Sequence, residues 1–302
     1  MAVLARLLAM LAVVLAGTGL RAIGVLDDRR TGRLNALAYY VALPALIFTA
    51  TYDQSVGDLL SPALLAGLLV VLFATAALAW LVHRDRWSRA RRSVAVVQSY
   101  HSNLGYLGLP LVAATFDGEV TAIASVILGI VSLVQVPLTI VVLVGINDAD
   151  AQVREELRQI ATNPVLASLV AGLAVGEIGV AVPSTVAAGL DGLGALALPL
   201  ALLCVGASLE LDLPSVDAGA TLSVVALKIA AMPALAWIVF STLGVDPAAL
   251  TAGVVMFGTP TAVSTFVYTT EIGGDEGFAS LNVFVTTVAS IGSLFVLIHL
   301  IG

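Results

Sequence analysis

The chain has 302 residues, of which 60% are hydrophobic and 11% charged, and its formal net charge is −7. Soluble domains carry about 25% charged residues, so this composition excludes an ordinary soluble protein and predicts an all-α polytopic membrane protein. The single cysteine, Cys204, excludes an intramolecular disulfide framework and a multi-cysteine metal site. The acidic balance and the lack of a basic patch argue against nucleic acid as a partner.

Ten apolar segments follow one another along the chain, each near the length of about 20 residues that a transmembrane helix needs. We predict spans at about residues 3–22, 34–51, 60–82, 93–115, 120–145, 161–179, 189–208, 219–243, 248–270 and 279–301. The first run also has the basic residue and apolar core of a cleaved signal peptide. Its counterpart in the second half of the chain favours a retained helix.

The most charged stretch, Asn147 to Gln159, lies at the middle of the chain. It predicts a first five-helix repeat over residues 1–146, a cytoplasmic linker at 147–159 and a second five-helix repeat over 160–302. Each half contains an odd number of predicted helices, so two related halves would insert with opposite topology, as inverted repeats do.

Two short strings support a duplication because they recur in the same order at similar offsets. Ala42-Leu43-Pro44 recurs as Ala197-Leu198-Pro199, and Gly108-Leu109-Pro110 is echoed by Gly258-Thr259-Pro260.

Basic residues predict the orientation. Eleven of the 13 fall in three connections that share one side of the membrane: Arg21, Arg29, Arg30, Arg33, Arg84, Arg86, Arg89, Arg91, Arg92, Arg154 and Arg158. Cytoplasmic loops carry an excess of Lys and Arg. We therefore expect a multi-pass protein of the plasma membrane, with these loops in the cytoplasm and both termini outside. Arg6, near the first span, opposes this assignment.

Two polar, glycine- and proline-containing stretches interrupt the fourth and ninth spans, at residues 102–110 and 257–265. An interrupted helix is tolerated in a membrane only where it is buried in protein or lines a watery cavity. Interruptions at matching positions of two halves are the best sequence pointer to a transporter's binding site. A proline kink satisfied by neighbouring polar side chains is the simpler alternative for either stretch alone.

The residues of these two breaks are the candidate site. For substrate binding we single out His101, Ser102, Asn103, Gly105, Tyr106, Thr259, Thr261 and Ser264. For the crossover of the two helices we single out Gly108, Pro110, Gly258 and Pro260, since glycine permits close backbone approach and proline prevents a regular helix.

Three further polar residues are candidates for coupling to an ion, Na⁺ or H⁺: Gln98, Lys228 and Glu271. Lys228 stands inside an apolar run, where an ionisable group is a functional hypothesis by default; snorkelling to the cytoplasmic interface is its alternative. Glu271 lies beside two glycines, and a surface position is its alternative. No cofactor and no metal site are expected.

The sequence resembles the auxin efflux carrier family, which is related to the bile acid:sodium symporters. The resemblance covers nearly the whole chain and rests on residues 40–48, 103–110, 163–164, 198–199, 206–209 and 260–262. It implies two inverted five-helix repeats, with spans 4 and 9 broken and crossing at Pro110 and Pro260. It also implies a scaffold of spans 1, 2, 6 and 7, often at a homodimer interface, and a mobile transport unit of spans 3–5 and 8–10 that moves like an elevator.

Family substrates are small organic anions, including indole acetate and dicarboxylates such as malate or malonate. Asn103 matches the family's asparagine seven residues before the crossover proline, which implies a substrate contact. Ser264 stands where bacterial members often have asparagine, and that departure leaves the size of the substrate open.

The sequence therefore predicts a secondary transporter of a small organic anion, with efflux as the expected direction. The alternative within the same class is a sodium-coupled symporter of a bile-acid-like or steroid-like compound. An intramembrane enzyme or a receptor-like binding module is a third possibility. The absence of HExxH, Walker A, GxSxG and paired intramembrane aspartates from the sequence argues against an enzyme.

Overall fold

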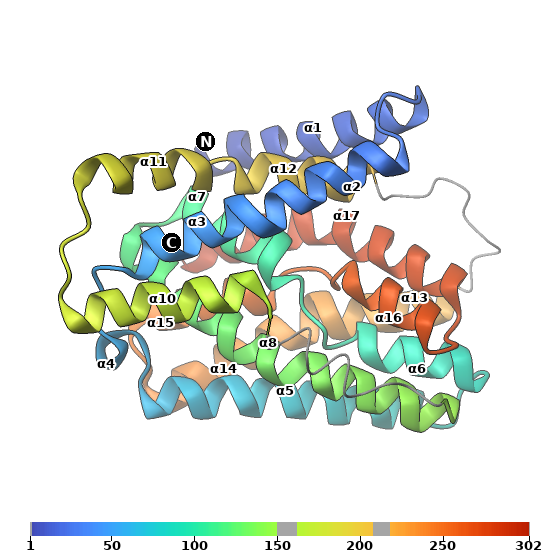
Figure 1. The fold of residues 1–302 in the computed structure, drawn as a ribbon. Coiled ribbons are helices and arrows are strands. Elements are labelled where there is room, and N and C mark those ends of the chain that lie inside the picture. Colours follow the sequence, from blue (N-terminus) through green and yellow to red (C-terminus); the bar gives the residue numbers. More distant parts are fainter. Residues whose placement is uncertain (1, 150–161, 208–217, 302) are drawn as a thin grey trace.

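The computed structural model describes residues 2–149, 162–207 and 218–301, and these residues form helices joined by short connections (Figure 1). Among these described residues, six helical segments are long and apolar enough to cross a membrane: Asp28–Thr51, Pro62–His83, Gly118–Asn147, Ser184–Ala207, Ala218–Leu243 and Glu276–Ile301. Four shorter apolar helices are Ala9–Ala22, Leu104–Thr115, Pro164–Ile178 and Pro247–Phe257. The predicted all-helical membrane protein is confirmed, whereas the count of ten spans and the inverted repeat stay predictions.

In the first half of the chain the helices are α1 (Ala2–Ala22), α2 (Asp28–Leu37), η1 (Ala38–Ala42), α3 (Leu43–Thr51), α4 (Val56–Leu59), α5 (Pro62–His83), α6 (Arg89–Gln98), η2 (Leu104–Gly108), α7 (Leu109–Thr115) and α8 (Gly118–Asn147). The start of α2 corrects the prediction of a loop up to Arg33. The Asp27 side chain accepts a hydrogen bond from the backbone N–H of Arg30 at 2.8 Å and so begins the helix at Asp28.

In the second half the helices are α10 (Pro164–Ile178), α11 (Ser184–Gly194), α12 (Ala197–Ala207), α13 (Ala218–Val225), η3 (Ala226–Ala231), α14 (Met232–Leu243), α15 (Pro247–Phe257), α16 (Ser264–Glu271) and α17 (Glu276–Ile301). Most of the predicted cytoplasmic linker, including Arg154 and Arg158, lies outside the described residues.

The three π-helices, η1, η2 and η3, each end two residues before a proline: Pro44, Pro110 and Pro233. Proline has no N–H to donate and its ring clashes with the carbonyl four residues earlier. In each case the residue just before the proline donates its N–H to the carbonyl five residues earlier, as Leu109 does to Leu104. The wider turn thus accommodates the proline without ending the helix.

One group of helices packs through small residues. Helix α1 lies along α12, where Gly17 and Gly206 bring the two backbones close together, and the Thr18 hydroxyl donates to the Gly206 carbonyl at 2.9 Å. Helix α3 packs against α10 and α11, with Gly172 and Gly194 at the contacts. Small residues allow this close approach where no aqueous hydrophobic effect drives helices together.

A second group contains α5, α8, α14 and α15, with α6, α7, α13 and α17 packed against them. Phe240 of α14 is fully buried between Gly67 of α5 and Gly253 of α15, and it stacks on Phe257. In Figure 1, α1 and α12 run along the upper edge of the molecule and α5 and α14 along the lower edge. The breaks in the chain lie between these two edges, where α6 leads to η2 and α15 leads to α16.

Candidate functional site

The two breaks meet inside the protein. Helix α6 ends at Gln98 and helical structure resumes at Leu104, while α15 ends at Phe257 and α16 begins at Ser264. Between them Ser102 and Thr261 form an antiparallel bridge. Asn103 donates its backbone N–H to the Pro260 carbonyl at 2.9 Å, and Ala262 donates to the His101 carbonyl at 3.1 Å. The two segments thereby satisfy one another's backbone groups, as the interior of a membrane protein requires.

Glycine permits the close contact at this crossing. A Cβ atom on Gly108 would stand 2.8 Å from the Met256 Sδ and 3.2 Å from the Thr259 Cγ2. A Cβ atom on Gly258 would stand 2.7 Å from the Leu297 Cδ1. These two predicted crossover glycines therefore lie where a side chain would collide with a neighbouring helix. Pro260 supplies the carbonyl that accepts from Asn103. Pro110 differs from the prediction: it lies inside the helical segment Leu104–Thr115, because the wider π-turn of η2 accommodates it, and the interruption comes earlier, at residues 99–103.

Gln135 of α8 holds the first break in place. Its Oε1 accepts from the Ser102 N–H and its Nε2 donates to the Ser102 carbonyl, both at 3.2 Å, so the side-chain amide pairs with the backbone as a neighbouring strand would. Only 2% of Gln135 is exposed. Gln135 was not among the residues predicted from the sequence, although a glutamine in an apolar span is a signal that could have found it.

His101 is fixed by a neighbouring hydroxyl. Its Nδ1 lies 2.8 Å from the Thr139 Oγ1, and the Tyr100 hydroxyl lies 3.2 Å from the same oxygen. The ring of His101 also approaches the ring of Tyr268, at 6.3 Å between centroids. His101 and Tyr268 both line a cavity, so these contacts orient two aromatic side chains on its wall.

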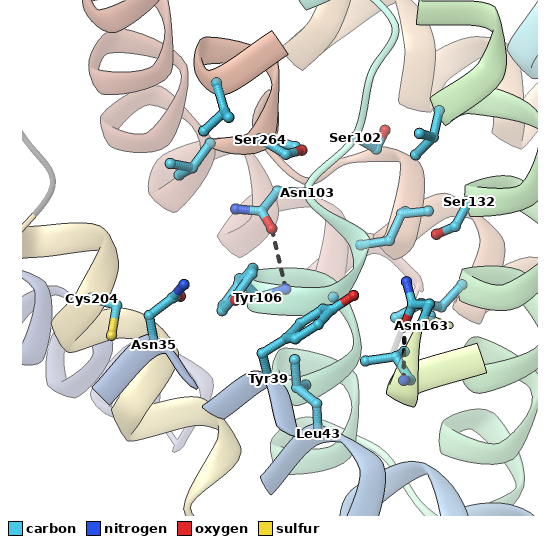
Figure 2. A pocket seen from close by; sticks show the side chains of 18 of the residues that line it. Asn35, Tyr39, Leu43, Ser102, Asn103, Tyr106, Ser132, Asn163, Cys204 and Ser264 are labelled. Carbon is cyan, nitrogen blue, oxygen red and sulfur yellow. Dashed lines mark hydrogen bonds between the residues drawn. The ribbon is translucent and has the colours of Figure 1, made fainter. Parts of the chain in front are cut away.

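This cavity has a volume of about 510 Å³ and lies between the breaks and the helices α2, η1, α10 and α12 (Figure 2). One wall is made by the breaks with α8 and α16, and includes His101, Ser102, Asn103, Gly105, Tyr106, Ser132, Gln135 and Ser264. The facing wall comes from α2, η1, α10 and α12, and includes Asn35, Tyr39, Tyr40, Asn163 and Cys204. No Asp, Glu, Lys or Arg occurs among the described residues that line it.

Asn103 begins the helical segment Leu104–Thr115 at the cavity wall. Its Oδ1 accepts from the Tyr106 N–H at 3.2 Å, an N-cap contact drawn in Figure 2. With the oxygen engaged, the amide NH₂ is the part of this side chain left to face the cavity. Ser264, the first residue of α16, lines the same cavity. Two helix N-termini, which carry partial positive charge, therefore border it.

The facing wall carries polar groups that were not predicted from the sequence. Asn35 of α2 lies beside Tyr106, and Tyr39 of η1 lies beside Asn163 (Figure 2). Asn163 caps α10, since its Oδ1 accepts from the Val165 N–H at 2.9 Å. These residues are far from the breaks in sequence, and no local pattern placed them at the cavity.

The remaining predicted residues lie away from the cavity. Thr259 and Thr261 are fully buried in the second break without lining it. Gln98 is engaged on both sides of its amide, donating to the Thr265 hydroxyl and the Ala279 carbonyl and accepting from the Asn282 amide at 2.9 Å. Glu271 is exposed at the end of α16.

Lys228 is fully buried, which rules out the snorkelling alternative. It lies in η3, and its ammonium group donates a hydrogen bond to a backbone carbonyl of the protein interior.

The described residues thus form a helical membrane protein with an uncharged cavity, lined in part by polar side chains, beside the two breaks. The family described as "Membrane transport protein", which includes the auxin efflux carriers, matches residues 2–161 and 151–298. The chain belongs to this family, and the resemblance stated from the sequence is confirmed.

Two relatives have names that refer to transport. The chain is 27% identical over 280 residues to a protein of Rhizobium meliloti (strain 1021) named "Putative malonate transporter", an alignment that covers 89% of this chain and 87% of the relative. It is 31% identical over 115 residues to an "Uncharacterized transporter" of Methanothermobacter thermautotrophicus, covering 37% of this chain and 38% of that protein.

Proposed function

We propose that this protein is a secondary transporter of a small organic anion, with a dicarboxylate of the size of malonate as the best candidate. The observation that carries the proposal is the helix N-terminus capped by Asn103, which borders the cavity at the meeting point of the two breaks. Helix N-termini are ready-made anion sites because their N–H groups and dipole favour negative charge. The Asn103 amide would donate one further hydrogen bond to a carboxylate.

The polar groups on both walls favour a ligand with an acceptor at each end. Asn103 and Ser264 face the cavity from one wall, and Asn35 and Asn163 from the other. A dicarboxylate would use both sets. An auxin-like aromatic carboxylate would use one set and place its ring against Tyr39 or Tyr106. The name of the Rhizobium relative supports the first choice.

We also propose elevator-type alternating access. The wall formed by α1, α2–α3, α10 and α11–α12 would be the scaffold and the dimer interface, and the helices that carry the breaks would move along it with the substrate. The cavity lies between these two groups, which supports the proposal. Loops that contain arginine would face the cytoplasm, with both chain ends outside.

Uptake into proteoliposomes tests the function. Labelled malonate, malate, indole acetate and taurocholate would be offered with and without sodium and proton gradients, against protein-free vesicles. Saturable flux of a small carboxylate supports the proposal. Flux of taurocholate alone, driven by sodium, would favour the bile-acid-like symporter, and the absence of saturable flux for every compound would overturn the proposal.

Cys204 offers a test of the movement, since it is the one cysteine of the sequence and lines the cavity on the proposed scaffold wall. If the opposite wall moves past it during transport, malonate will change its rate of reaction with a maleimide. A rate unaffected by malonate at saturating concentration would contradict the elevator proposal.

A further inference from the structure

A second cavity, separate from the substrate cavity, is an apolar groove between α1, α12 and the end of α7. Its volume is about 350 Å³, and its walls include Ala9 and Met10 of α1, Ala114 of α7 and Leu202 of α12. Among the described residues that line it, Thr115 is the one polar residue and none is charged. The groove shares no lining residue with the substrate cavity, so the proposed transport of an anion does not use it.

The groove exists because α7 is short. This helix has seven residues and ends at Thr115, whereas its neighbours α1 and α12 belong to longer helical segments, Ala2–Ala22 and Ser184–Ala207. Ala9 comes seven residues after the start of α1, which is about 10 Å along the axis at a rise of about 1.5 Å per residue. A groove at that distance from the helix end lies within the hydrocarbon region, which is about 30 Å thick.

The groove continues inward as a narrow apolar void. Met10 and Leu202 line both the groove and this void, which has a volume of about 20 Å³ and is closed by residues of η2 and α17. Thr287 and Ser290 of α17 also line it, but each donates its hydroxyl to a carbonyl of its own helix at 2.7 Å. The inner part of the groove is therefore as apolar as its mouth.

A hydrocarbon chain suits this shape better than water or a helix does. A buried water needs about two to four polar partners, and Thr115 is the one polar residue of the groove. A helix of a second copy is about 10–12 Å across, so it would cover the mouth without entering the narrow inner part. A lipid acyl chain is a single file of methylene groups, as apolar as leucine, and the bilayer supplies it at this depth.

We propose that this groove binds one acyl chain of a membrane phospholipid. Helices α1 and α12 belong to the group that packs through small residues, whereas α7 and α17 belong to the group around α5, α8, α14 and α15. The chain thus lies as a wedge between the two groups. If the groups move past each other during transport, a chain that fits the present arrangement stabilises it over the others. The wedge, unlike the binding site, rests on the proposed function.

Photolabelling tests the binding site without any need for transport. The protein would be reconstituted with a phosphatidylcholine that carries a diazirine on one acyl chain, and labelled residues would be mapped by mass spectrometry. Ala114→Trp fills the groove, and Leu222→Trp is the matched control, since Leu222 of α13 is 68% exposed and does not line the groove. We expect stronger labelling at Met10 and Leu202 than at Leu222. It should fall about fivefold in Ala114→Trp, because a filled cavity leaves no room for the chain, and stay near wild type in Leu222→Trp.

Two results overturn the binding site. The first is labelling at Met10 and Leu202 no stronger than at Leu222, which a second copy seated over the groove would also give. This comparison uses wild type alone, so it holds even if Ala114→Trp does not fold. The second is unchanged labelling of the groove in a folded Ala114→Trp protein.

Malonate exchange in vesicles of the same lipid tests the wedge. A tryptophan at position 114 replaces a chain that can leave with one that cannot, so we expect Ala114→Trp to slow exchange about threefold by favouring one arrangement. Leu222→Trp should exchange at the wild-type rate. Unchanged exchange in Ala114→Trp overturns the wedge. No saturable wild-type flux overturns the proposed function and the wedge, whereas the binding site is decided by the labelling.

Discussion

The amide side chains around the breaks are of two kinds: those fully hydrogen-bonded to the protein and those that line the cavity. Gln98 and Gln135 have the hydrogen-bonding capacity of their amides engaged by protein groups. Asn103 and Asn163 engage their oxygens as helix caps and belong to the cavity wall. The first kind holds the interrupted backbone in one conformation, and the second is available to a ligand.

Gln135→Ala should destabilise the protein because it leaves the N–H and carbonyl of Ser102 without their partner. An unsatisfied buried group costs about 1–3 kcal/mol. We expect a lower Tm in detergent for Gln135→Ala. Ser132→Ala, one turn earlier on α8 and also at the cavity, should leave the Tm near wild type. Equal Tm values for Gln135→Ala and wild type would contradict the assigned role.

Part of the site was predictable from single residues. His101, Ser102 and Asn103 are polar residues in an apolar run, and the structure places all three at the cavity. Their contact with substrate stays a prediction. Asn35 and Tyr39 were not predicted, because they are brought to the cavity by packing between distant helices and carry no local signal. Gln135 carries the signal of a polar residue in an apolar span, but its pairing with Ser102, 33 residues away, could not be predicted from that signal.

At the scale of elements, proline alone did not indicate where a helix would be interrupted. Pro44 and Pro233 follow π-turns within continuous helical segments, and Pro137 lies inside α8. Within the predicted spans 93–115 and 248–270, where glycine and small polar residues accompany the proline, the described chain leaves helical structure at residues 99–103 and 258–263. Those residues provide the hydrogen bonds and the small volume that an interrupted segment needs.

A matched pair of glycine variants tests the crossing of the two breaks. Gly108→Val should lower the free energy of unfolding by about 1–3 kcal/mol, because overpacking forces neighbours apart. The Cβ atom would already stand 2.8 Å from Met256. Gly105→Ala should have little effect on stability, since its Cβ atom meets only Leu128 at 3.8 Å. Thermal unfolding in detergent measures both, and equal stabilities would contradict the close crossing.

At the scale of the whole molecule, the sequence was sufficient for the class and the family and insufficient for the cavity. Long apolar runs and the motifs around Pro110 and Pro260 identified a membrane transport protein. The separation into two packed groups of helices depends on contacts between distant residues, such as Gly17 with α12 and Phe240 with α5 and α15. The Arg91–Asp275 ion pair, at 2.9 Å, likewise joins the start of α6 to the segment before α17.

The central claim is that the anion binds at the helix N-terminus begun by Asn103 and is carried with it. The most direct measurement is malonate exchange in proteoliposomes for wild type, Asn103→Ala and Asn147→Ala. Asn147 is the matched control, since its amide donates to the Ile272 carbonyl at 3.0 Å away from the cavity. We predict that Asn103→Ala loses more than about 90% of the flux, as expected for loss of a hydrogen bond to a charged group, while Asn147→Ala retains most of it. Full flux in a folded Asn103→Ala protein would contradict the claim.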